Sequence, residues 1–161
     1  MNELEGGVKN CSTAAITRVF AYYRGLGVKR IPDDAQLYRE IKKAAQARGY
    51  TGRRGTGFTK IDDIINDMLV SYGLSGKAKS IYIWDFNTVK KEIDSNKPLI
   101  LNIAFGKYAD HTVTVVGYRE FKEKRKRRVR ILRIYDGWSR GVSELGFNKL
   151  GIASFTVLDL F

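Results

Sequence analysis

Three residues of this chain have side chains suited to nucleophilic catalysis, and each stands at the end of an expected helix or strand. Cys11 is the only cysteine and opens a predicted helix, where backbone N–H groups and the helix dipole stabilise a thiolate. His111 is the only histidine and begins a β-branched strand, from which its ring could act as a base near neutral pH. Asp136 ends the following strand, where it could accept the ring N–H of a histidine. Together these residues point to acyl transfer.

Each of these residues also has an ordinary structural explanation. Most free cysteines are small buried residues, a lone histidine is as often structural as catalytic, and Asp-Gly commonly ends a strand in a turn. Catalysis is favoured because all three fall at element ends in the order nucleophile, base and acid. One Cys and one His cannot build a zinc site of the Cys/His types, so we expect no metal and no other cofactor.

The elements that must position these residues follow from the apolar pattern. Helical spacing recurs in four segments, from Cys11 to Gly25, from Pro32 to Gly49, from Thr59 to Gly73 and from Asn87 to Asn96. Strand-like runs cover residues 80–84, 99–105, 111–118, 129–135 and 153–160. Thr59 with Asp62 three residues later resembles a capping box for the third helix.

Helices therefore come first along the chain and strands come later. This segregation predicts an α+β fold with the helices on one side of an antiparallel sheet, because an α/β sheet needs strand and helix to alternate. The length of 161 residues, without a repeat or a linker, predicts a single domain over residues 1–161.

Four short motifs carry a resemblance to a known family. They are NCSTAAITRVFAYYRG around Cys11, PLILNI before the histidine, ADHTVTVVGY around His111 and YDGWS around Asp136. In this order they resemble the papain-like cysteine peptidases, and among them the bacterial C39-like branch related to the double-glycine bacteriocin-leader peptidases. The resemblance implies a papain-like fold, in which the nucleophile starts a central helix packed on a C-terminal antiparallel sheet. It also implies a cysteine peptidase acting on peptide or protein substrates.

The resemblance assigns a role to each of the three residues. Cys11 would be the nucleophile that forms a thioester acyl-enzyme, His111 the general base and then acid, and Asp136 the orienting partner. The same branch suggests a bacterial secreted or cell-surface protein with an export signal absent from this chain, and the cytoplasm is the alternative. No apolar run is long enough to span a membrane.

The expected site differs from the pattern of this branch at two places, and one further residue is a candidate for lining it. Such peptidases usually supply an oxyanion donor from a Gln about six residues before the cysteine. This chain has Glu5 there, and since an ionised Glu cannot donate, Asn10 is the other candidate donor. Ser12 and Thr13 stand where the branch commonly has Gly-Pro. Trp138 resembles the indole that shields the His–Asp contact in papain-like sites, and its alternative role is that of a core aromatic.

The formal net charge of +12 is concentrated in two segments. Residues 122–130 hold seven basic residues and one acidic residue, and residues 42–54 hold five basic residues and no acid. The first segment separates two strands, so it should form the exposed end of a β-hairpin, roughly 20–30 Å from His111 and Asp136. The candidate contacts for an anionic partner are Lys122, Lys124, Arg125, Lys126, Arg127 and Arg128.

A second function therefore stays open beside the peptidase. A catalytically silent papain-like domain could use these cations as a binding module for nucleic acid or an anionic cell surface, with salt-dependent affinity. The tip lacks interleaved aromatic residues for stacking bases. The GTGFT segment at 55–59 lacks the Lys-Ser/Thr of a phosphate-binding loop. We expect a solvated connection there, with the border of a substrate cleft as the alternative.

Overall fold

The computed structural model describes residues 9–104, 110–124 and 127–161. The helices of these residues are α1 (Cys11–Gly25), α2 (Asp34–Ala47), η1 (Phe58–Lys60), α3 (Ile61–Ser71), α4 (Phe86–Asp94) and η2 (Phe147–Lys149), where η denotes a 3₁₀ turn. The strands are β1 (Lys77–Ile81), β2 (Leu99–Ile103), β3 (His111–Lys122), β4 (Arg128–Tyr135), β5 (Ser143–Gly146) and β6 (Ala153–Asp159). Helices dominate the first half and strands the second, so the predicted α+β class is confirmed.

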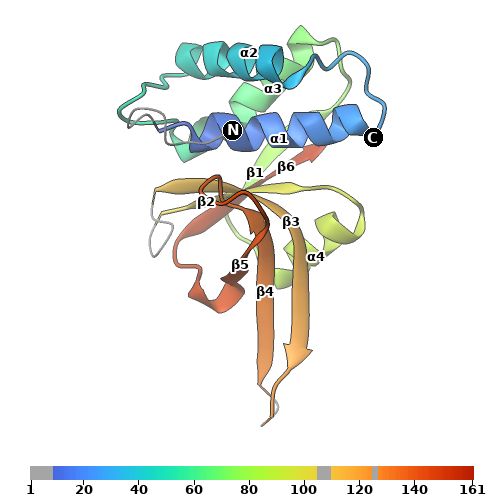
Figure 1. The fold of residues 1–161 in the computed structure, drawn as a ribbon, viewed down its shortest axis with the longest axis vertical. Helices are drawn as coiled ribbons and strands as arrows, with labels where there is room; N and C mark the ends of the chain where they lie inside the picture. Colours follow the sequence, from blue (N-terminus) through green and yellow to red (C-terminus); the bar gives the residue numbers. More distant parts are fainter. Residues whose placement is uncertain (1–8, 105–109, 125–126) are drawn as a thin grey trace.

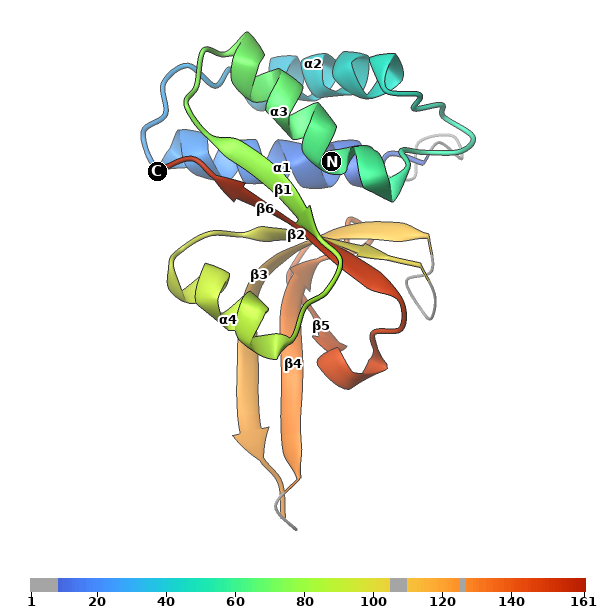
Figure 2. The ribbon, with the colours of Figure 1, turned by 180° about the vertical axis from the view of Figure 1, so that it is seen from behind.

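The described strands form one antiparallel sheet in the order β1-β6-β2-β3-β4-β5. Helices α1, α2 and α3 gather on one face of this sheet, and α4 covers part of the other (Figure 1, Figure 2). Successive side chains of a strand point to opposite faces, and the fully buried β2 sends Ile100 to one core and Leu99 and Leu101 to the other. Both faces therefore need apolar cover, and the expectation that all helices lie on one side is wrong for α4.

The capping boxes differ from the expectation. Helix α3 starts after the turn η1, and its N-cap residue makes no side-chain hydrogen bond, so the pair Thr59 and Asp62 forms no box. The Asp62 carboxylate instead accepts a hydrogen bond from the Ser80 amide at 3.1 Å. A capping box does form at α4, where Asp85 accepts from the Thr88 amide and Thr88 accepts from the Asp85 amide. The contact with the neighbouring strand β1 outweighs the local pattern at Asp62.

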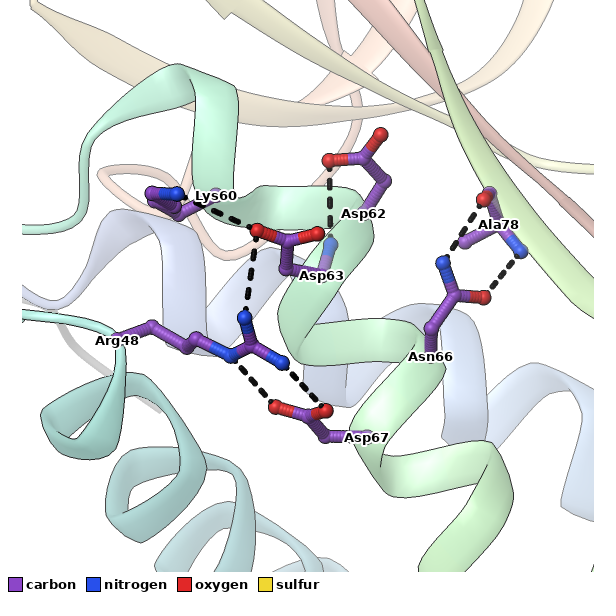
Figure 3. A network of polar contacts seen from close by, with 7 residues as sticks. All are labelled: Arg48, Lys60, Asp62, Asp63, Asn66, Asp67 and Ala78. Atoms are coloured by element: carbon purple, nitrogen blue, oxygen red, sulfur yellow. Dashed lines mark hydrogen bonds and ion pairs between the residues drawn. The ribbon is translucent and has the colours of Figure 1, made fainter.

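Strand β1 lies three residues earlier than the predicted segment 80–84. Asn66 of α3 donates to the carbonyl of Ala78 at 3.0 Å and accepts from its amide at 2.8 Å, which fixes the chain beside the helix (Figure 3). The chain then leaves the sheet edge, and Ile83 is 96% exposed. Strand β5 is absent from the predicted set because it is four residues long and Leu145 is its one buried residue.

A charged network ties α2 to α3. Arg48 donates from Nε and Nη2 to the two carboxylate oxygens of Asp67, at 2.8 Å each (Figure 3). Asp63 forms an ion pair with the same guanidinium at 3.6 Å and another with the ammonium group of Lys60 at 3.5 Å. Hydrogen bonds from Arg48 hold the pKa of Asp67 below its usual range. Arg48 belongs to the basic segment 42–54, so part of that predicted positive patch is neutralised.

Strands β3 and β4 continue beyond the sheet as a two-stranded ribbon. Strand β2 pairs with β3 over 111–115 and β5 pairs with β4 over 131–134, whereas β3 and β4 pair out to Lys122 and Arg128. The ribbon projects away from α1, α2 and α3 (Figure 1, Figure 2). The basic segment therefore lies at the far end of the strands from His111, as the hairpin prediction requires. No helix within the described ranges is long and apolar enough to cross a membrane.

Candidate active site

Cys11 is the first residue of α1, which packs on α2, α3 and the sheet. Cys11 is 8% exposed, and all residues from 11 to 17 are buried, so the N-terminal half of α1 lies in the interior of the molecule. Asn10 is the N-cap residue and makes no side-chain hydrogen bond to the first turn. The unpaired N–H groups of that turn and the positive end of the helix dipole therefore lie beside Cys11.

His111 is the first residue of β3 and is 6% exposed. Its Nε2 atom lies 2.6 Å from the backbone carbonyl oxygen of Asp136. A carbonyl oxygen only accepts, so Nε2 donates this hydrogen bond, and proton transfer by the ring would use Nδ1. The ring stacks on Trp138 with centroids 4.3 Å apart and planes 24° from parallel. The hydrogen bond and the stacking together fix the orientation of the imidazole.

Asp136 follows β4, is 5% exposed, and has a carboxylate held by several donors. Its Oδ1 accepts from the amides of Trp138 and Ser139 at 3.0 and 2.9 Å and from the Ser139 hydroxyl, and its Oδ2 accepts from the Ser143 hydroxyl at 2.9 Å. Burial opposes ionisation of this carboxyl, but these hydrogen bonds outweigh it and lower the pKa to about 2. Asp136 is therefore an anion throughout the neutral range.

A chain of hydrogen bonds joins the neighbours of Cys11 and His111. The hydroxyls of Ser12 and Thr112 are 3.2 Å apart, which links the start of α1 to the start of β3. Thr112 then donates to Asn102 of β2 at 2.9 Å, and Asn102 bonds to a serine of β6 at 3.4 Å. Because these side chains are buried, the chain restrains the position of the helix start against the strand.

Cys11 and His111 line the same cavity, which has a volume of about 490 Å³. Its other described walls come from Lys9, Ser12, the loop 54–58, Tyr82 and the segments 102–104, 110–112 and 152–154. The cavity therefore lies between the start of α1 and the adjoining loop on one side and the ends of β2, β3 and β6 on the other. This placement gives the thiol and the imidazole access to one bound molecule.

The cavity wall combines apolar and charged side chains. Phe58 and Tyr82 are each 53% exposed and meet edge to face at 6.4 Å, and Ile152 is 69% exposed. Lys9 and Arg54 add two cations to the same wall. An extended peptide supplies both apolar side chains and carbonyl groups, so these side chains are suited to it.

The other predicted site residues do not all lie at the cavity. Trp138 is 46% exposed and stacks on the histidine, so the core-aromatic alternative is wrong. Asn10 is not among the cavity walls, and its side-chain oxygen accepts from the Tyr50 hydroxyl at 2.7 Å. Glu5 lies outside the described residues. The GTGFT loop borders the cavity, so the cleft alternative replaces the expected solvated connection.

Two groups of site residues were not predicted from the sequence. The hydrogen-bonded pair Ser12 and Thr112 is one hundred positions apart, and no local pattern joins two hydroxyls at that separation. Tyr82 and Ile152 come from two separate loops, whereas Phe58 opens the turn η1 and belongs to the GTGFT segment, whose alternative role was the cleft border. A signal for the first pair was present, since each member directly follows a predicted catalytic residue.

Within the described parts of the chain, no group of His, Cys, Asp and Glu residues could hold a metal ion.

Comparisons with known proteins show the fold and the family. A Bacillus anthracis protein, provisionally assigned as a C39-like peptidase in its crystal structure, shares the fold with a TM-score of 0.59 at 11% identity. The superposition covers 98% of this chain and 92% of that chain. Curated protein sequences give no match. Residues 2–147 match the Peptidase C39-like family, which supports a peptidase that acts on peptide or protein substrates. Since this match covers most of its length, the chain belongs to the Peptidase C39-like family.

Proposed function

We propose that the chain is a cysteine peptidase in which Cys11 is the nucleophile, His111 the general base and acid, and Asp136 the orienting partner. The observation that carries the proposal is the shared cavity of Cys11 and His111, with the imidazole held by the carbonyl of Asp136. The family relationship supports the same reaction class. Nothing in this arrangement needs a cofactor.

In the first half of the reaction the peptide bond is exchanged for a thioester. The Nδ1 atom of His111 takes the proton of the Cys11 thiol, and the thiolate Sγ attacks the carbonyl carbon of the scissile bond. A tetrahedral oxyanion forms, and its collapse breaks the C–N bond. The leaving amine takes the proton from the imidazolium, which leaves an acyl thioester on Cys11 and a neutral histidine.

Water completes the reaction. Nδ1 of His111 takes a proton from a water molecule as its oxygen attacks the thioester carbon, and the second tetrahedral intermediate expels the Cys11 sulfur. The thiolate regains the proton from the imidazolium. One peptide and one water thus give a carboxylic acid and an amine, and the enzyme returns to its starting state.

Two features of the site support the charged intermediates. The ionised carboxylate of Asp136, whose backbone carbonyl holds the ring, would stabilise the imidazolium, because opposite charges interact strongly where water is largely excluded. The backbone N–H of Cys11 at the start of α1 would receive the oxyanion. Asn10 stays a candidate second donor from the sequence, but it is not among the cavity walls, and its side-chain oxygen accepts from the Tyr50 hydroxyl. Glu5 stays a candidate from the sequence alone.

The reactivity of the single thiol tests the proposal. The protein is treated with a thiol-reactive peptidase inhibitor, and the rate of mass increase is compared for wild type, Cys11→Ala and His111→Ala. Because the chain holds one cysteine, any single adduct reports Cys11. We expect wild type to react at least about tenfold faster than His111→Ala at neutral pH, since the imidazole raises the thiolate fraction.

A matched control separates catalysis from folding. Thr156→Ala alters another buried polar residue of the sheet, on β6 and outside the cavity wall, and should keep the wild-type rate. If Cys11 reacts no faster than a free thiol in solution, and if His111→Ala leaves that rate unchanged, the peptidase proposal is wrong. The silent binding domain would then be the better explanation of the fold.

A further inference from the structure

The outer part of the β3–β4 ribbon has no role in the proposed reaction. We define this distal ribbon as residues 118–124 and 127–131. Beyond the pairing of β2 and β5, its two strands pair mainly with each other, and α4 packs against one face. Figure 2 shows the ribbon extending well below the body of the molecule. A ribbon of this length and exposure is placed to contact a partner.

The end of the distal ribbon is strongly cationic. Lys122, Lys124, Arg127 and Arg128 are all exposed, and Arg125 and Lys126 between them lie outside the described residues. Within the described part of the chain, Lys122, Lys124 and Arg127 form no ion pair. Glu120 lowers the local charge little, because its carboxylate already pairs with Lys90, Arg128 and Arg130 of the same region.

One face of the distal ribbon carries an apolar strip that ends next to this cationic tip, where Lys122 and Arg128 project from the opposite face. Phe121 is 42% exposed and lies directly opposite Val129, and Ile131 lies two residues further along the same face of β4. None of the three belongs to either core cluster. The opposite face packs on α4, where Tyr118 contacts Phe86 with ring centroids 5.6 Å apart. The strip is therefore on the face that α4 leaves uncovered.

We propose that the distal ribbon docks on the surface of an anionic phospholipid membrane. Its lysines and arginines would contact lipid phosphates, and Phe121 with Val129 would enter the interface between headgroups and acyl chains. An apolar strip that ends at a cationic tip is the chemistry of interfacial membrane contact, in which each group adds to the affinity. Because the ribbon projects away from the cavity, such docking leaves the cavity accessible to a peptide.

Two other partners fit these observations less well. Single-stranded nucleic acid is held by a series of stacking rings, but Phe121 has aliphatic neighbours on its face. A second copy of the chain would bring two cationic ends together, and their repulsion would weaken the contact. An anionic lipid surface satisfies both the charge and the aliphatic side chains.

Vesicle sedimentation tests the proposal with the full chain. The probes are vesicles of phosphatidylcholine with and without phosphatidylglycerol, and we expect binding only when the anionic lipid is present. The double variant K122Q/K124Q should lower the partition coefficient about thirty-fold, and Phe121→Ser about fivefold to tenfold. Circular dichroism and peptidase activity on a soluble peptide should stay at wild-type values, because these residues lie outside both cores and the cavity.

Matched controls make the result specific. K29Q/K43Q removes two exposed lysines outside the ribbon, and Val70→Ser removes a residue that is 81% exposed on α3. Vesicle binding that survives in both controls but falls in both ribbon variants supports the proposal. Absence of binding to anionic vesicles overturns it, as does an equal loss in K29Q/K43Q. Retention on duplex DNA without any binding to vesicles would also overturn it and identify nucleic acid as the partner.

Discussion

The two ends of the β3–β4 hairpin have the same backbone pairing, but one end is buried and the other is exposed to solvent. At the near end, β3 is flanked by β2 and covered by α1, and His111, Thr112 and Asp136 are all buried. At the far end the strands pair with each other, and Phe121 and Lys122 are exposed. Neighbouring elements, more than strand propensity, therefore decide where a rigid polar site can form.

The charges at the two ends follow the same rule. The Asp136 carboxylate is buried, and four hydrogen bonds from three residues hold it. Buried charges need such partners because the loss of water is otherwise too costly. The cations at the far end keep their water and need no partner. A fixed anion is suited to catalysis, and solvated cations are suited to contact with another surface.

The largest expected effect is on catalysis at the near end. His111→Ala should lower kcat/KM on a peptide substrate by about 10²–10⁴-fold, because the variant loses its proton-transfer group. K122Q/K124Q at the far end should leave kcat/KM within about twofold of wild type. Steady-state kinetics on one peptide measures both. An equal loss in the two proteins would show that the ends of the hairpin are functionally coupled.

The second effect is on stability. Leu132 is fully buried near the middle of β4, so Leu132→Ala should lower the free energy of unfolding by about 2–5 kcal/mol. Phe121→Ala should cost less than about 1 kcal/mol, because the ring is outside both cores. Urea unfolding monitored by circular dichroism gives both values. If Phe121→Ala costs as much as Leu132→Ala, the far end belongs to the core.

The third effect concerns pH. The folded pKa of Asp136 lies below its ordinary value of 3.8, at about 2, so its stabilisation is present above the ordinary value and is lost as the pH falls toward 2. Asp136→Asn should therefore lower the free energy of unfolding by about 2 kcal/mol at neutral pH. The difference between wild type and variant should shrink from about pH 4 downward. A difference that stays constant over this range would contradict the assignment of an ionised carboxylate.

The smallest effect concerns the hydroxyl pair beside the catalytic residues. A double-mutant cycle of Ser12→Ala and Thr112→Val should give a coupling energy of about 0.5–1.5 kcal/mol, because each change removes one partner of a buried hydrogen bond. Thr114→Val is the matched control, since its hydroxyl is buried and has no hydrogen-bond partner within the described residues. If the coupling energy between Ser12→Ala and Thr114→Val is as large as that between Ser12→Ala and Thr112→Val, the hydrogen bond between Ser12 and Thr112 is not a specific link.

Much of the fold and part of the site could be predicted from local patterns. The start of α1 at Cys11, the start of β3 at His111 and the end of β4 before Asp136 agree with the expected elements. These patterns are reliable because each depends on periodicity or turn residues within a few positions. Strand β1 and the opening of α3 were misplaced, because contacts between Asp62 or Asn66 and a neighbouring strand override the local signal.

Local residue preferences are enough to predict which residues could react, at which element ends they stand, and that a basic segment caps a hairpin. Packing between distant segments brings Cys11 and His111 to one cavity, sets a backbone carbonyl of Asp136 against the ring, and leaves an apolar strip next to the cationic tip. These features depend on how distant segments pack, and the energy of a buried contact depends on neighbours that no local pattern specifies.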